Sequence, residues 1–66
     1  MNPAEVRDLV EKIRAERGDP EAAHGMEDAL HQSVLAAIAD GTCDQPQECA
    51  RIAMTTRDID FSRWYA

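Results

Sequence analysis

The chain has 66 residues, and acidic residues outnumber basic ones by 13 to 7, which gives a formal net charge of −6. This length allows one small domain, and the negative charge argues against binding to a nucleic-acid backbone, whose recognition usually needs a basic face. Hydrophobic residues make up 44% of the chain, which is too much for a disordered acidic tail. No apolar run approaches the ~18 residues of a membrane span, and the start of the chain has no signal-peptide pattern. We therefore expect a single cytoplasmic domain over residues 1–66 that makes no contact with a membrane.

The first expected helix covers about residues 3–17. Asn2 can cap its start, and Pro3 suits the first helical position because a proline there loses no hydrogen bond. Apolar residues then recur every three or four positions, as one buried stripe requires: Val6, Leu9, Val10 and Ile13. Gly18 is expected to end this helix.

The second expected helix covers residues 20–40 and is the longest element. Asp19 and Pro20 repeat the start signal of the first helix, and Gly41 is a natural left-handed terminator. Leu35 widens the apolar side, so we expect this helix to contact two neighbours. The narrower apolar sector contains Ala23, Met26, Leu30, Val34, Ala37 and Ile38.

The third expected helix covers about residues 45–56, with Asp44 and Gln47 as a variant capping box. After a break at residues 55–58, a short fourth helix is expected at about 59–65. This tail holds the three aromatic residues of the chain, Phe61, Trp64 and Tyr65. We expect Ile59, Phe61 and Trp64 to seal the core against Leu9, Ile13, Leu30 or Val34. The pattern predicts an all-α fold, a compact three-helix bundle with a short C-terminal helical tail.

Four polar residues share one face of the second expected helix: His24, Glu27, Asp28 and His31. We call them the polar face. We expect an exposed flank that contacts a partner, together with Arg63, Trp64 and Tyr65 of the tail. The same spacing can also chelate a divalent metal, but one helix supplies only two or three ligands, so we assign no metal ligand and no cofactor.

The two cysteines, Cys43 and Cys49, are separated by five residues, which matches neither a CxxC redox pair nor a zinc knuckle. Thiols in an intracellular chain are usually reduced. We expect Cys49 to be a small core residue and Cys43 to lie near the surface. A disulfide between them is the alternative.

No catalytic motif is present, and the chain is too short to build a deep cleft, so we expect no enzyme and no catalytic residues. Residues 20–56 could be taken for a helix-turn-helix, but the would-be recognition helix carries Glu48 and only Arg51, which makes direct DNA binding a poor fit. An acidic surface that imitates DNA is a further alternative.

Four stretches carry a resemblance to known proteins: residues 15–24 (AERGDPEAAH), 27–31 (EDALH), 37–41 (AIADG) and 56–64 (TRDIDFSRW). They resemble a family of small uncharacterised proteins encoded by mycobacteriophages and actinobacterial genomes. The resemblance implies a phage origin and a compact helical fold, but no activity. Members of the family have a cysteine after the tryptophan, where this chain has Tyr65, so a thiol role at that position is absent here.

These observations together predict a non-enzymatic phage accessory protein that binds a host bacterial protein in the host cytoplasm. A metal-binding helical domain that uses the polar face is the first alternative. A homodimer that buries Leu35 and Ile38 between two chains is the second, because small domains often gain stability by association.

Overall fold

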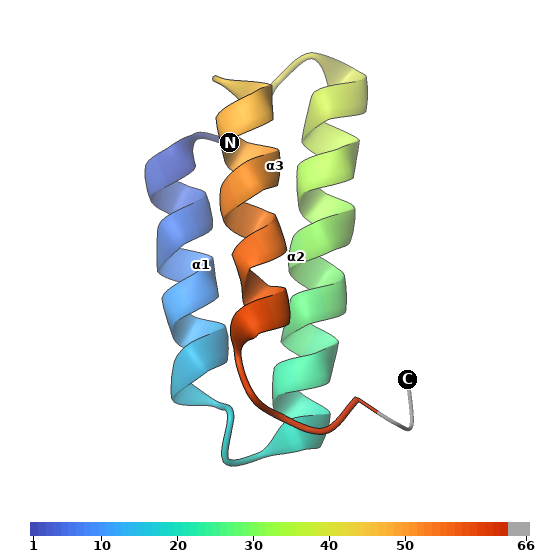
Figure 1. The fold of residues 1–66 in the computed structure, drawn as a ribbon. Coiled ribbons are helices and arrows are strands. Elements are labelled where there is room, and N and C mark those ends of the chain that lie inside the picture. Colours follow the sequence, from blue (N-terminus) through green and yellow to red (C-terminus); the bar gives the residue numbers. More distant parts are fainter. Residues whose placement is uncertain (64–66) are drawn as a thin grey trace.

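Three helices, of which the second runs antiparallel to the other two, make up most of the chain, and the computed structural model describes residues 1–63 (Figure 1). They are α1 (Pro3–Ala15), α2 (Pro20–Asp40) and α3 (Pro46–Met54), and a 3₁₀ turn, η1 (Thr55–Asp58), follows α3. Each helix contacts the other two. The prediction of an all-α three-helix bundle is confirmed.

The first two helices begin as the sequence predicts. The Asn2 side chain accepts a hydrogen bond from the Glu5 backbone N–H at 3.0 Å, and Asp19 accepts one from Ala22 at 3.2 Å. Each cap is followed by a proline in the first turn. These side chains satisfy backbone donors that have no partner inside the helix, so both starts are fixed locally.

The end of α2 follows the prediction, and the end of α1 differs from it. Gly41 has φ of 75°, and Thr42 N–H donates to the Ala37 carbonyl at 2.9 Å, which closes α2 in a left-handed turn. By contrast α1 ends at Ala15, two residues before the predicted end, and Gly18 does not adopt a positive φ. A tight turn that begins with a bond from Glu16 N–H to the Ile13 carbonyl (3.0 Å) ends this helix instead.

The start of α3 differs from the predicted capping box. Asp44 lies one residue too early, and Gln45 occupies the capping position with φ of 54° and without a side-chain hydrogen bond. The backbone N–H of Asp44 donates instead to the Met1 carbonyl at 2.7 Å. This bond connects the α2–α3 turn to the beginning of the chain.

The expected fourth helix is wrong over its described part. The helical path continues as the 3₁₀ turn η1 where a break was predicted, and residues 59–63 then run without helix. The backbone of Ile59 is extended, and this closing segment (residues 59–63) crosses the end of the bundle towards α2 (Figure 1). Trp64 and Tyr65 lie outside the described residues.

The core lies along the axis of the bundle and includes the closing segment. Ile59 and Phe61 are buried in it, as predicted, whereas Leu35 is 67% exposed and does not widen the core. The contacts of α2 with both neighbours come instead from the narrower apolar sector. The buried cluster contains Val6, Val10, Ile13, Ala23, Leu30, Val34, Cys49, Ile52, Ala53, Ile59 and Phe61. Within the described part of the chain, no helix is both long and apolar enough to cross a membrane.

Candidate functional site

The polar face of α2 is not the exposed flank that the sequence predicts. Of its four residues only Asp28 is exposed. Glu27 is buried, with 4% of its surface exposed, and the two histidines are half-buried. Glu27 lies four residues after Ala23 and three before Leu30, both of which are core residues. The helical period therefore places the Glu27 side chain inside the bundle.

Glu27 is paired with Arg63 of the closing segment. Arg63 Nε donates to Glu27 Oε1 at 2.8 Å, and Nη2 donates to Oε2 at 3.1 Å, so one edge of the guanidinium binds both oxygens of the carboxylate. Such two-point pairs are stronger and more directional than single charged contacts. Two residues that were expected to contact a partner contact each other instead.

Arg63 also donates hydrogen bonds to three backbone carbonyls beyond the end of α3. Its Nη2 donates to Thr56 O at 2.8 Å and to Ile59 O at 3.1 Å, and its Nη1 donates to Phe61 O at 3.2 Å. The guanidinium carbon lies 3.8 Å from the centre of the Phe61 ring. One side chain thus links η1 to the closing segment through three backbone carbonyls.

The charge of Glu27 is stabilised by this pairing. Burial is the largest single influence and raises the pKa of the Glu27 carboxyl, but the hydrogen bonds from Arg63, its positive charge and the other polar neighbours together outweigh burial, so the pKa lies below its ordinary value. The Glu27 carboxylate in turn raises the pKa of Arg63. The pair is therefore ionised at neutral pH.

His31 holds α2 against α3. Its Nε2 lies 3.2 Å from the Ala53 carbonyl and 3.0 Å from Thr56 Oγ1. Because a carbonyl oxygen only accepts, this contact assigns a hydrogen to Nε2. The Thr56 hydroxyl also donates to the Ala53 carbonyl at 3.1 Å. His31 is therefore a structural contact between two helices.

The remaining pair of the polar face is His24 and Asp28, whose Nδ1 and Oδ2 atoms are 3.7 Å apart. Among residues 1–63, no group of three or more histidine, cysteine, aspartate or glutamate side chains is arranged to hold a metal ion. Glu27 and His31 make hydrogen bonds to other parts of the bundle. Of the polar face, the metal-binding alternative therefore keeps only His24 and Asp28 as candidate ligands.

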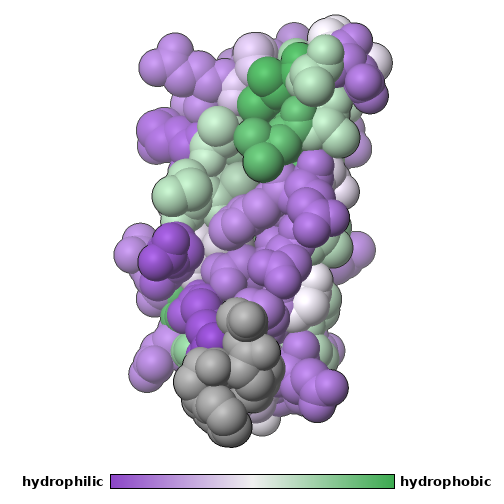
Figure 2. All heavy atoms as spheres, turned by 90° about the vertical axis from the view of Figure 1, so that its right-hand side faces the viewer, coloured by the Kyte–Doolittle hydropathy of each residue, from purple (hydrophilic) through white to green (hydrophobic). Residues whose placement is uncertain are grey.

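An apolar surface lies beside the polar face, and it contains Leu35 and Ile38, which the sequence analysis assigned to the homodimer alternative. Leu35 and Met54 are 67% and 57% exposed, and Ile38 is exposed next to them. We call these three residues the apolar face. Figure 2 shows the most hydrophobic surface on this side of the molecule near the end of α2 that leads into the α3 connection.

A hollow of about 200 Å³ lies between Leu35 and Met54. It lies where α2 and α3 pack side by side, and its lining is almost entirely apolar, apart from one histidine: His31, Val34, Leu35, Ala50, Ala53 and Met54. A second hollow of about 170 Å³ lies between α1 and α2, next to Leu9 and Met26, which are only half exposed. Only the first hollow is bordered by large exposed side chains.

The sequence contained signals for both features. Glu27 falls in the middle of the apolar sector of its helix, and a buried carboxylate needs a basic partner, which pointed to a distant arginine. Leu35 lies outside that sector by the same helical spacing, which pointed to an exposed position. The partner of Glu27, however, lies 36 residues away, and no spacing rule identifies Arg63.

Comparisons with protein families, with curated proteins and with solved structures found no match for this chain.

Proposed function

We propose that this chain is a non-enzymatic, phage-encoded binding domain that uses its apolar face to hold a helix of a bacterial host protein. The observation that carries the proposal is the exposure of Leu35 and Met54 on the two sides of an apolar hollow. Large exposed hydrophobic residues that gather in one place are typical of interaction surfaces. Methionine at such a place adapts to the shape of a partner.

The shape of the hollow favours a helical partner. It follows the line between α2 and α3, which are antiparallel and packed against each other. A groove between two helices accepts the side chains of a third helix laid along it. Leu35 and Met54 would contact this helix on its two sides, and Ile38 would extend the contact towards the end of α2.

Charge favours a partner protein over a second copy of the chain. Two copies would each carry a net charge of −6 and would repel one another. A helix with an apolar stripe and basic flanks meets no such repulsion, and Asp28 lies exposed on α2 two turns before Leu35. We therefore propose a basic amphipathic helix as the occupant.

This surface replaces most of the contacts expected from the sequence. Glu27, His31 and Arg63 are engaged in bonds that hold the bundle together, so they are not proposed as contacts. The bacterial identity of the partner and the cytoplasmic location depend on the resemblance to mycobacteriophage proteins. Trp64 and Tyr65 remain candidate contacts from the sequence alone.

The proposal can be tested by affinity capture from a mycobacterial lysate with three forms of the chain. These are the wild type, the double variant Leu35→Ser/Met54→Ser, and the control Ala36→Ser, which changes an exposed residue next to Leu35 on α2. Truncation of exposed side chains leaves the stability nearly unchanged. Burying two such side chains contributes about 1.5–3 kcal/mol each, so we expect the double variant to bind a purified partner at least about tenfold more weakly.

Two results would contradict the proposal. The first is a partner that the double variant retains with unchanged affinity in calorimetry. The second is a wild-type dimer in light scattering that the double variant converts to monomer, because a second copy would then cover the apolar face.

A further inference from the structure

We propose that Cys43 and Cys49 form a peroxide-sensitive pair that closes to a reversible intramolecular disulfide. Both thiols point at the same atom, the carbonyl oxygen of Asp44. The sulfur of Cys49 lies 3.3 Å from this oxygen, and the sulfur of Cys43 lies 3.8 Å from it. The inference is independent of the proposed binding function, because it concerns the opposite end of α3 from Met54.

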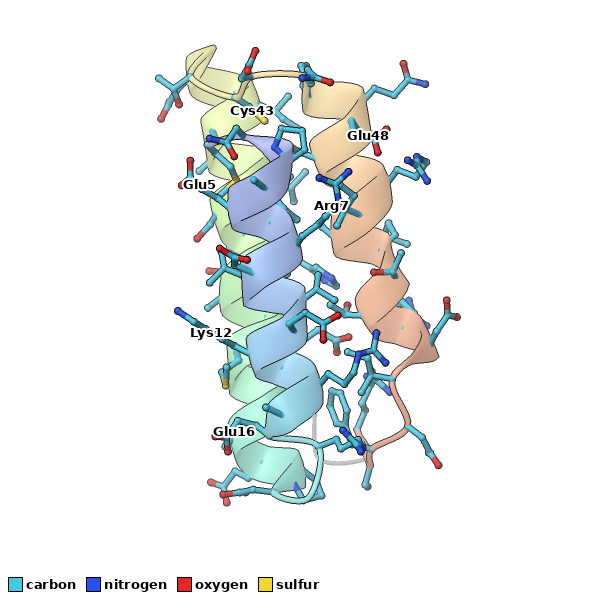
Figure 3. All side chains as sticks on the ribbon, turned by 90° about the vertical axis from the view of Figure 1, so that its left-hand side faces the viewer. Glu5, Arg7, Lys12, Glu16, Cys43 and Glu48 are labelled. Carbon is cyan, nitrogen blue, oxygen red and sulfur yellow. The ribbon has the colours of Figure 1, made fainter. Side chains whose placement is uncertain are left out.

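The fold brings the two thiols together through the unusual start of α3. Gln45 adopts a left-handed backbone conformation with φ of 54°, which turns the chain sharply between the two cysteines. Cys43 thereby folds back over the first turn of α3, where Cys49 lies. Figure 3 shows Cys43 at the end of the bundle where α1 begins.

The two cysteines differ in exposure, and this difference assigns their roles. Cys43 is half-buried and open to a small solute, whereas Cys49 is 0% exposed. Burial, together with the neighbouring Cys43 thiol, raises the pKa of Cys49 to about 11. Cys43 is therefore the thiol that reacts with the oxidant, and Cys49 is the thiol that then forms the disulfide with it.

The chemistry balances with hydrogen peroxide as the oxidant. The Cys43 thiolate attacks one peroxide oxygen, the O–O bond breaks, and the departing hydroxide takes up a proton to give water and a sulfenic acid on Cys43. The Cys49 sulfur then attacks the Cys43 sulfur and the S–O bond breaks. The departing hydroxide takes the Cys49 proton as a second water. The two thiols have then lost two electrons, and a dithiol reductant returns them by exchange.

Closure would replace two weak S–H···O contacts by one covalent bond across the α2–α3 turn. A reversible bond of this kind fits a chain in a reducing compartment, where disulfides form transiently and report oxidation. We expect oxidation to raise the melting temperature of the wild type by about 5–10 °C, because the bond restricts the unfolded chain.

The test is mild peroxide treatment of the wild-type chain followed by mass spectrometry. We expect the intact mass to fall by about 2 Da, both cysteines to resist alkylation, and a dithiol reductant to reverse both changes. In Cys49→Ala the Cys43 sulfenic acid has no neighbouring thiol, so we expect oxidation to continue to a sulfinic acid, with a gain of about 32 Da. In Cys43→Ser the buried Cys49 should stay unmodified.

Three results would overturn the proposal. They are a wild-type chain whose Cys43 goes to sulfinic acid as readily as in Cys49→Ala, a disulfide between two chains, and free thiols after peroxide treatment. The second and third results are read on the wild type alone, so they do not depend on a cysteine variant that folds. Circular dichroism on each variant checks its folding separately.

Discussion

At the scale of single residues, Arg63 has the largest role that the structure reveals. Its guanidinium contacts the Glu27 carboxylate, three backbone carbonyls and the Phe61 ring. Arginine suits this position because its planar fork donates several hydrogen bonds in fixed directions, which a lysine ammonium cannot do. The side chain thus fastens the closing segment to α2.

We expect Arg63→Met to lower the free energy of unfolding by about 2–4 kcal/mol. The change leaves Glu27 as a buried charge without its partner, and loss of one partner of a buried pair is strongly destabilising. Arg57→Met, at an exposed arginine six residues earlier, should change the stability by less than about 0.5 kcal/mol. Urea denaturation followed by circular dichroism measures both.

The double variant Glu27→Leu/Arg63→Met separates charge from packing. It removes both charges and fills the space with apolar side chains, so much of the lost stability should return. A double variant no more stable than Arg63→Met would show that the pair acts through its hydrogen bonds to the chain.

The pairing also predicts how stability depends on pH. The folded pKa of Glu27 lies below its ordinary value of 4.5, so the pair stabilises the fold fully above that value. This contribution is lost as the pH falls through the folded pKa. The melting temperature of the wild type should therefore exceed that of Glu27→Gln at pH 6, and the difference should shrink below about pH 4. An equal difference at pH 6 and pH 3 would contradict the assigned pairing.

At the scale of the elements, the helix ends depend on local backbone conformation. Gly41 has a positive φ and ends α2, whereas Gly25 lies inside α2 and faces open space. The two glycines therefore have opposite effects on the stability of the same helix.

We expect Gly41→Ala to destabilise the chain by about 1 kcal/mol and Gly25→Ala to stabilise it by about 0.5–1 kcal/mol. Alanine is strained in the left-handed conformation but is the best residue in a helix interior. The added Cβ meets no heavy atom within 4 Å at either site apart from the adjoining residues and the backbone of its own helix, so packing does not disturb the comparison. Thermal unfolding of the two variants gives the test, and equal shifts would contradict the assigned end of α2.

At the scale of the whole molecule, the bundle and the closing segment form one folding unit. Ile59 is 2% exposed and belongs to the same buried cluster as the three helices. A domain of this size has a small free energy of unfolding. A substitution that weakens the packing of the closing segment therefore destabilises the whole domain.

We expect Ile59→Ala to cost about 2–4 kcal/mol and to lower the stability of all three helices together. Leu35→Ala, a similar truncation at an exposed residue, should cost less than about 1 kcal/mol. Amide hydrogen exchange can check this cooperativity. Loss of protection only in residues 55–63 of Ile59→Ala would show that the closing segment folds independently.

The sequence by itself determined the three helices, because each of them begins at a proline and its buried side follows a repeat of three to four residues. The bounds of α2 were predicted in this way, whereas the burial of Ile59 and Phe61 was expected from the apolar and aromatic content of the tail. The prediction was wrong at Gly18, because a local bond from Glu16 to Ile13 ends α1 earlier, and at Asp44, whose backbone bonds to Met1 of the distant chain start.

Only the tertiary structure determined which partners the polar side chains bind. The sequence placed Glu27 and His31 on one face of a helix, but it could not show that the face packs on α3 and the closing segment. The Glu27–Arg63 pair joins residues far apart in the chain, and the meeting of Cys43 with Cys49 depends on a left-handed Gln45 that no capping rule predicts. Local patterns fix the helices because their hydrogen bonds are local, whereas contacts between distant side chains exist only once the helices have packed.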